Sequence, residues 1–237
     1  FAAKIHTPYL VMAGVLVVVA IAILFSSLPE IKPSEANAEA GESASIGKQS
    51  VFQFPHLWLG VLCLFVYVGV EVLAGDAIGT YGNGFGLPLD QTKFFTSFTL
   101  GAMLLGYLAG LVAIPRFVSQ ERYLSISAVL GVVFALAAFF TKGYVSVGFV
   151  AALGFANAMM WPAIFPLAIK GLGQFTETGS ALLVMGIAGG AIIPQLFAVL
   201  KQHHDFQLVF VALAVPCYLY ILFFARYGHR FGKAPRA

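Results

Sequence analysis

Two carboxylates, Glu71 and Asp76, lie within the apolar stretch 57–81, which reads LWLGVLCLFVYVGVEVLAGDAIGTY. The stretch is long enough to cross a bilayer as a helix. A charged group in hydrocarbon costs on the order of 3 kcal/mol even on the lenient insertion scale, so such acids normally face a bundle interior or a water-filled cavity. No Lys or Arg lies at a matching depth to neutralise Glu71. Glu71 is therefore a site hypothesis by default, with a neutral, protonated carboxyl as the alternative.

Asp76 is not expected to share a site with Glu71. It follows Glu71 by five residues, which is a rotation of about 140° around a helix. We expect Asp76 to pair near the outer mouth of the protein or to cap a break in the helix around Gly75.

Aromatic and amide side chains accompany the acid at helical spacing. Tyr67 and Glu71 are four residues apart and share one helix face, as do Asn157 and Trp161 in the run 144–168. Each pair places one polar group beside one ring, and Gln195 is a third polar candidate. The alternatives are packing roles for Tyr67 and Trp161, a hydrogen bond between helices for Asn157, and a structural role near the outer interface for Gln195.

The composition is that of a polytopic helical membrane protein. Of the 237 residues, 60% are hydrophobic and 10% are charged, and the mean hydropathy is +0.91. No soluble domain of this size needs so much apolar surface. The formal net charge of +3 is too small to indicate a nucleic-acid partner. The expected surroundings are a lipid bilayer.

The motifs of an enzyme or a metal site are missing from the sequence. It contains no HExxH, no GxSxG and no His beside an acid inside an apolar run. Cys63 and Cys217 lie inside apolar runs without metal-site spacing. The sequence therefore predicts no enzyme, no metal and no cofactor.

Apolar runs bounded by charged or turn residues indicate seven helices. They cover roughly 9–25, 57–80, 92–114, 124–140, 144–168, 178–200 and 207–225. The segment LPEIKPSEANAEAGESASIGKQS after the first run has no apolar period and is predicted to be a flexible linker. The other connections are short, so the last six runs form one compact unit. The predicted parts are a transmembrane helix at 1–26, a linker at 27–55, a six-helix bundle at 56–226 and a tail at 227–237.

The basic residues predict the orientation. One side of the membrane collects nine of them and the other side four; these are Lys32, Lys48, Arg116, Arg122, Lys170, Arg226, Arg230, Lys233 and Arg236 against Lys4, Lys93, Lys142 and Lys201. By the positive-inside rule the linker and the C-terminal tail are cytoplasmic, and Phe1 lies outside.

Two of the runs carry residues that interrupt helices. The fifth run contains Pro162 and Pro166, and the sixth contains a cluster of glycines followed by Pro194. Proline kinks a helix and glycine allows a neighbouring helix to approach closely. Such breaks are typical of cavity-lining transporter helices, and ordinary tight packing is the alternative.

Three blocks resemble a known family. YVGVEVLAGDAIGTYG at 67–82, FANAMMWPAIFPLAIKGLG at 155–173 and TETGSALLVMGIAGGAIIPQLF at 176–197 are similar to the sugar-transporting branch of the major facilitator superfamily, which includes the L-fucose:proton symporter and bacterial glucose/galactose transporters. TPYLVMAG at 7–14 resembles the start of that family's sixth helix.

The resemblance implies an all-α membrane fold of twelve helices in two halves. This chain would correspond to the sixth helix, the cytoplasmic central loop and helices seven to twelve, with two inverted three-helix repeats in the six-helix unit. It lacks an initiator Met, and helices one to five are expected elsewhere in the same transporter. The implied activity is proton-coupled uptake of a hexose or related sugar across the bacterial cytoplasmic membrane.

The resemblance also assigns roles to the candidate residues. A hexose presents hydroxyls on its edges and a flatter apolar face, so its site needs carboxylate or amide groups and a ring to stack on. Glu71 and Asp76 are the candidates for binding the proton or another coupling cation, although the coupling acids of the fucose branch lie in the half that this chain lacks. The candidate sugar ligands are Tyr67, Glu71, Asn157, Trp161 and Gln195.

The connection AIPRFVSQERYL at 113–124 holds Arg116, Glu121 and Arg122. It resembles a degraded copy of the cytoplasmic charge motif of the superfamily, in which arginines pair with acids or helix ends. The alternative is ordinary positive charge on the inner side.

Two other functions fit parts of the pattern. Seven runs with an outer N-terminus also suit a seven-helix receptor, and Glu121, Arg122 and Tyr123 follow the third run. That triplet lies beyond Pro115, and no Lys in the last run could hold retinal. A half-transporter kept as a non-transporting remnant is the other alternative.

Overall fold

A computed structural model describes residues 2–25 and 49–232. The chain divides into two compact units, 1–39 and 40–237. In the first unit, the helix α1 (Ala2–Leu24) contains the predicted apolar run, of which Tyr9–Leu24 is a short apolar helix. Its side chains from Tyr9 to Leu24 are exposed, as an apolar helix requires if it is to face lipid.

The second unit contains the six predicted membrane spans. Among the described residues, six helical segments are long and apolar enough to cross a bilayer: Pro55–Gly75, Asp90–Ile114, Gln120–Phe140, Gly143–Ile169, Gly173–Leu200 and Phe206–Arg230. The all-α prediction is therefore confirmed. The boundaries predicted for the linker and the tail fall largely outside the described residues and stay predictions.

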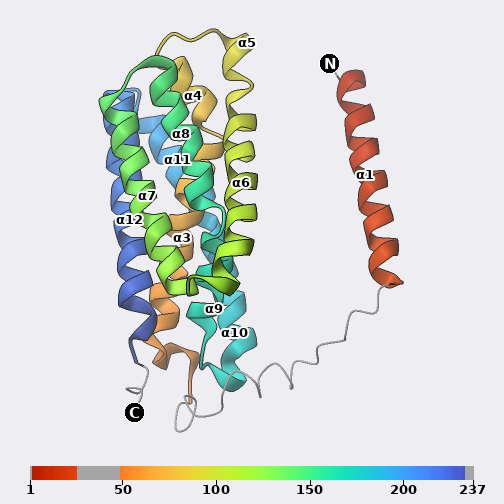
Figure 1. Cartoon of the computed structure of the whole chain (residues 1–237), viewed down its shortest axis with the longest axis vertical. Coiled ribbons are helices and arrows are strands. Elements are labelled where there is room, and N and C mark those ends of the chain that lie inside the picture. Colours follow the sequence, from red (N-terminus) through yellow and green to blue (C-terminus); the bar gives the residue numbers. More distant parts are fainter. Residues whose placement is uncertain (1, 26–48, 233–237) are drawn as a thin grey trace. The chain divides into compact units, whose positions relative to one another are not determined.

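Several spans consist of more than one helix (Figure 1). The α-helices of this unit are α3 (Pro55–Gly75), α4 (Ile78–Asn83), α5 (Leu89–Thr92), α6 (Phe95–Arg116), α7 (Gln120–Phe140), α8 (Gly143–Asn157), α9 (Met160–Ile169), α10 (Thr176–Met185), α11 (Gly189–Leu200) and α12 (Phe206–Arg226). Short 3₁₀ turns cover Val51–Gln53, Gly173–Phe175, Gly186–Ala188 and Gly228–Arg230 (η5). The end of the bundle that carries α4 and α5 is called the outer end below, following the predicted orientation.

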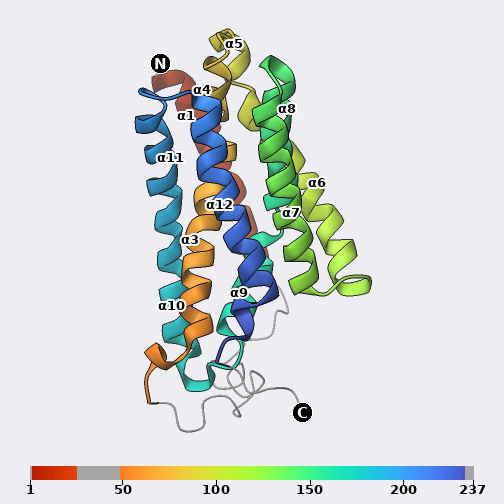
Figure 2. The ribbon, with the colours of Figure 1, turned by 90° about the vertical axis from the view of Figure 1, so that its left-hand side faces the viewer.

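The main helix contacts connect the two predicted three-helix repeats. The helix α6 packs on α8, and α11 packs on α3, while α7 and α12 pack on each other (Figure 2). If the spans are divided into the two predicted three-helix repeats, the second helix of each repeat lies against the first helix of the other. A two-fold pseudo-symmetry between the repeats produces this arrangement.

The first helix of each repeat is broken. In the first repeat α3 ends at Gly75 and α4 begins at Ile78. Two carbonyls at the end of α3 are satisfied from α6, because Thr96 Oγ1 donates to Gly75 O at 2.8 Å and Thr99 Oγ1 donates to Ala74 O at 3.2 Å. Backbone groups freed inside a membrane need such partners. The break predicted around Gly75 is confirmed.

The breaks of the fifth and sixth runs lie before their prolines. The helix α8 ends at Asn157, and Pro162 falls in the first turn of α9, where its missing N–H has no intrahelical acceptor to lose. The sixth run is interrupted at Gly186–Ala188, within the predicted glycine cluster, and Pro194 lies inside α11. The kinks expected at Pro162 and Pro194 stay predictions.

Close helix approach depends on glycines. A Cβ added at Gly154 of α8 would overlap the backbone carbonyl of Thr99 on α6. We expect Gly154→Ala to separate these helices and to lower the free energy of unfolding by about 1–3 kcal/mol, the usual cost of overpacking. The measurement is the melting temperature of the purified full polypeptide in detergent.

Gly148→Ala is the matched control, because an added Cβ at Gly148 on the same helix meets no atom within 4 Å. Alanine is also the better helix former. Equal melting temperatures for the two variants would contradict the packing account.

Candidate functional site

Glu71 lies in the middle of the bundle with one tyrosine as its hydrogen-bond partner. Both residues are on α3, one turn apart, and the Tyr67 hydroxyl donates to Glu71 Oε1 at 2.8 Å. Tyr67 is buried and Glu71 is half-buried. Among the described residues no Lys or Arg lies within 4.0 Å of the carboxylate. Glu71 therefore keeps most of its acceptor capacity for other donors.

Trp161 of α9 extends this cluster to a second broken span. Its ring meets the Tyr67 ring edge-on, with centroids 6.5 Å apart and planes at 62°. On its other side it stacks on Phe165, at 6.4 Å and 16°. Trp161 is only half-buried, so part of its side chain remains accessible.

Asn157 is the last residue of α8, directly before the break. Its side chain is fully buried, and its Oδ1 accepts from the Tyr218 hydroxyl of α12 at 2.9 Å. The Nδ2 group has no hydrogen-bond partner in the described part of the chain. A buried amide donor without a partner is costly, so it commonly marks a place where a ligand or water binds.

Tyr218 connects α12 to Asn157, because its hydroxyl donates to the amide oxygen. Sequence reasoning missed this tyrosine. The available signal was its position inside the last span, away from the membrane interfaces where Tyr is usually found.

Two predicted residues have no side-chain hydrogen bond or ring contact to this cluster among the described residues. Gln195 is exposed on α11 and its side chain has no hydrogen bond to another described residue. Asp76 is exposed at the end of α3 and lines an open pocket of about 330 Å³, together with Lys93. It forms no ion pair within the described residues. Glu71 does not line this pocket.

Gln207, which sequence reasoning missed, is the centre of a polar network at the outer end. It is buried in the first turn of α12, and its Nε2 donates to the carbonyls of Ala138 and Thr141, both at 2.8 Å. Its Oε1 accepts from Lys142 Nζ. Gln207 thus holds the end of α7 and the start of α8 against α12.

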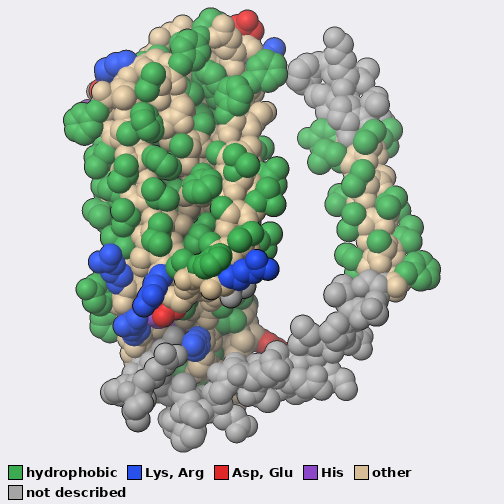
Figure 3. Space-filling model, viewed as in Figure 1, with side chains coloured by type: hydrophobic (Ala, Val, Ile, Leu, Met, Phe, Trp, Pro, Cys, Tyr) green, Lys and Arg blue, Asp and Glu red, His purple; other side chains and the backbone are tan. Residues whose placement is uncertain are grey.

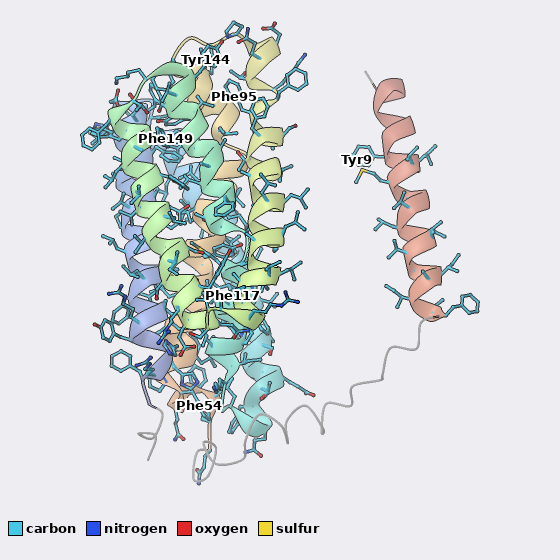
Figure 4. All side chains as sticks on the ribbon, in the orientation of Figure 1. Tyr9, Phe54, Phe95, Phe117, Tyr144 and Phe149 are labelled. Atoms are coloured by element: carbon cyan, nitrogen blue, oxygen red, sulfur yellow. The ribbon has the colours of Figure 1, made fainter. Side chains whose placement is uncertain are left out.

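Tyr81 of α4 completes the network. Its hydroxyl lies 2.7 Å from Ser146 Oγ, which itself donates to Ala138 O at 2.6 Å. Nearby, Phe95 and Tyr144 meet edge-on with ring centroids 6.5 Å apart (Figure 4). Every polar group of this network has a partner, which indicates a structural role.

The known proteins that the chain resembles are transporters and not enzymes. It is 30% identical over 229 residues to the glucose/galactose transporter of Brucella abortus biovar 1, covering 95% of this chain and 54% of the relative. It is 28% identical over 238 residues to the putative glucose/galactose transporter of Helicobacter pylori strain J99, with coverage of 97% and 56%. The L-fucose-proton symporter of Escherichia coli K12 is 26% identical over 230 residues, with coverage of 94% and 51%. No family model matches the sequence.

A solved structure has the same fold. The crystal structure of a Major Facilitator Superfamily transporter in the outward conformation superposes with a TM-score of 0.76 at 25% identity, covering 94% of this chain and 54% of that one. The chain thus spans about half the length of the relatives it matches. With its six spans and its bacterial relatives, it is an integral protein of the inner membrane.

We predict that the hydrogen bond from Tyr218 to Asn157 stabilises the fold as well as orienting the Asn157 side chain. In Tyr218→Phe, both polar atoms of the buried amide would lack partners, which costs about 1–3 kcal/mol of unfolding free energy. We expect a lower melting temperature in detergent. Tyr227→Phe is the control, since Tyr227 is 62% exposed and has no hydrogen bond to another described side chain. A Tyr218→Phe variant as stable as this control would show that the bond contributes little.

Proposed function

We propose that this chain, which by sequence and fold corresponds to the C-terminal half of a major facilitator superfamily sugar transporter, supplies one wall of a sugar-binding cavity and carries sugar across the membrane by alternating access. The observations that carry the proposal are the contacts among Tyr67, Glu71 and Trp161, and the unpaired amide of Asn157, which lies four residues before Trp161 at the break between α8 and α9. The opposite wall would come from the helices that precede α1 in the relatives.

The chemistry of the cluster suits a hexose. Neighbouring sugar hydroxyls can donate to the free lone pairs of Glu71 and accept from the Nδ2 of Asn157. The half-buried indole of Trp161 offers a surface for the apolar face of the ring. The relatives named for glucose, galactose and fucose support this substrate class.

Glu71 is also the better of the two candidates for binding the coupling proton. Its carboxylate is half-buried, accepts one hydrogen bond from Tyr67 and has no cationic partner among the described residues, so a proton can neutralise it. Asp76 is exposed at the outer end instead. The relative named as a proton symporter supports proton coupling.

The helix breaks supply places where the protein can bend. The breaks after Gly75, Asn157 and Met185 divide three spans, and two of them lie within about one turn of Glu71 and Asn157. Rocking of one helix segment against its neighbours would therefore change access to the site from one side to the other. A seven-helix receptor or a non-transporting remnant would not move sugar, so uptake separates these alternatives.

We expect Glu71→Gln to reduce sugar accumulation by at least tenfold, because the amide cannot take up a proton and presents a donor where the carboxylate accepts. The measurement is uptake of labelled hexoses by vesicles containing the full polypeptide, with and without an imposed pH gradient. Loss of the response to the gradient with retained sugar exchange would assign Glu71 to the proton, and loss of both would also make it a sugar ligand.

Glu177→Gln is the matched control, since Glu177 is exposed in the first turn of α10. Unchanged accumulation in Glu71→Gln, at equal expression, would show that the acid is structural and would remove the basis of the proposal.

Asn157→Ala is expected to weaken sugar binding by about 10- to 100-fold, which corresponds to one lost hydrogen bond to a buried polar group. Binding is measured by titration of the purified full polypeptide in detergent. The melting temperature without sugar is recorded in parallel, because the variant also removes the acceptor of Tyr218. Wild-type affinity in a folded variant would place the sugar elsewhere.

A further inference from the structure

We propose that the cytoplasmic ends of α7 and α12 form a binding site for the phosphate headgroup of an anionic phospholipid in the inner leaflet. An open pocket of about 440 Å³ lies between these helices. We call it the arginine pocket; its lining includes Arg122, Ser125, Ile126, Arg226, Tyr227 and Arg230. This site is separate from the sugar cluster and does not depend on its assignment.

The charges of the arginine pocket are unbalanced. Three arginines and one acid, Glu121, line it. Glu121 forms no ion pair with Arg122 or Arg226, and neither arginine side chain has a hydrogen bond to another described residue. The pairing of arginines with acids that the charge motif at 113–124 suggested is therefore not seen among the described residues. Guanidinium groups bind phosphate oxygens through two parallel hydrogen bonds, so the pocket is suited to a phosphate.

Arg230 is held in place by a buried histidine. His229 Nδ1 lies 3.0 Å from the carbonyl of Phe224, which can only accept, so Nδ1 carries a proton. The Nε2 of His229 then accepts from Arg230 Nε at 3.2 Å. This contact uses the Nε of Arg230 and leaves its two terminal nitrogens available for a ligand. The positive end of α7, at Gln120, adds to the attraction for an anion.

The surface next to the pocket favours a lipid over a free phosphate. Ile126, Val129 and Val133 follow Arg122 along one face of α7, and they are 42–52% exposed. On α12, Leu219 and Phe223 are 50% and 38% exposed and lie on the face that leads to Arg226. Figure 3 shows Lys and Arg side chains gathered near the lower end of the bundle, next to a largely hydrophobic surface.

A ligand that fits this surface has an anionic head and long apolar chains. The arginines sit at the ends of apolar spans, at the depth where headgroups lie, and the exposed Tyr227 is a residue type common at that interface. The acyl chains would lie along the apolar face of α7 and α12. A phosphate held between Arg122 and Arg226 would tie the end of one helix to the start of the other.

The test compares how two lipids bind to and stabilise the purified full polypeptide in detergent. We expect phosphatidylglycerol to raise the melting temperature by several degrees more than phosphatidylcholine, and native mass spectrometry to show retained phosphatidylglycerol molecules. The double variant Arg122→Gln/Arg226→Gln should lose most of this shift and bind the lipid at least tenfold more weakly. Glu121→Gln should strengthen binding, because it removes the one acid of the pocket.

Arg116→Gln is the matched control, since Arg116 is an exposed arginine at the same end of the protein that does not line the pocket. The proposal is overturned if the wild type does not distinguish the two lipids, or if the double variant responds like Arg116→Gln. A shift of equal size with inorganic phosphate alone would also overturn it, because the pocket would then be a site for a free anion.

Discussion

A helix that is interrupted inside a membrane must satisfy the backbone groups that the break sets free, and this requirement shapes the bundle. At the end of α3, the freed carbonyls accept hydrogen bonds from the hydroxyls of Thr96 and Thr99, both of which belong to α6. Thr99 also presents its backbone carbonyl to Gly154 of α8. Thr99 of α6 therefore contacts both α3 and α8 near their breaks, and Glu71 and Asn157 lie within about one turn of those breaks.

Buried polar groups at the outer end of the bundle and in its middle differ in how many of their hydrogen bonds are formed. At the outer end Gln207 uses both atoms of its amide, and Tyr81 and Ser146 are paired with each other. In the middle, Glu71 has one partner and the Nδ2 of Asn157 has none among the described residues. A saturated network rigidifies its surroundings, whereas unsatisfied groups at membrane depth cost free energy unless a ligand completes them. This contrast separates a structural cluster from a candidate site.

The sequence predicted those features that depend on local pattern. Six apolar spans and the shared face of Tyr67 and Glu71 follow from hydropathy and from helical spacing. The prolines did not mark the break positions, since Pro162 is tolerated in a first turn and the sixth run is interrupted at Gly186–Ala188, before its proline. Tyr218 and Gln207 were missed because their roles depend on partners 61 and 69 residues away, which no local pattern reveals.

The two broken spans that begin the predicted repeats have corresponding places in the bundle, but their polar groups are held in different ways. The partner of Glu71 is on the same helix, so the hydrogen bond from Tyr67 travels with α3 in any rigid-body motion. The partner of Asn157 is on α12, so movement of α8 against α12 must stretch or break that bond. The hydrogen bond of the acid is therefore internal to α3, although its ring neighbour Trp161 belongs to α9, whereas the hydrogen bond of the amide joins two helices. If the proposed site changes access by movement of α8 against α12, the free energy of the amide depends on the conformational state.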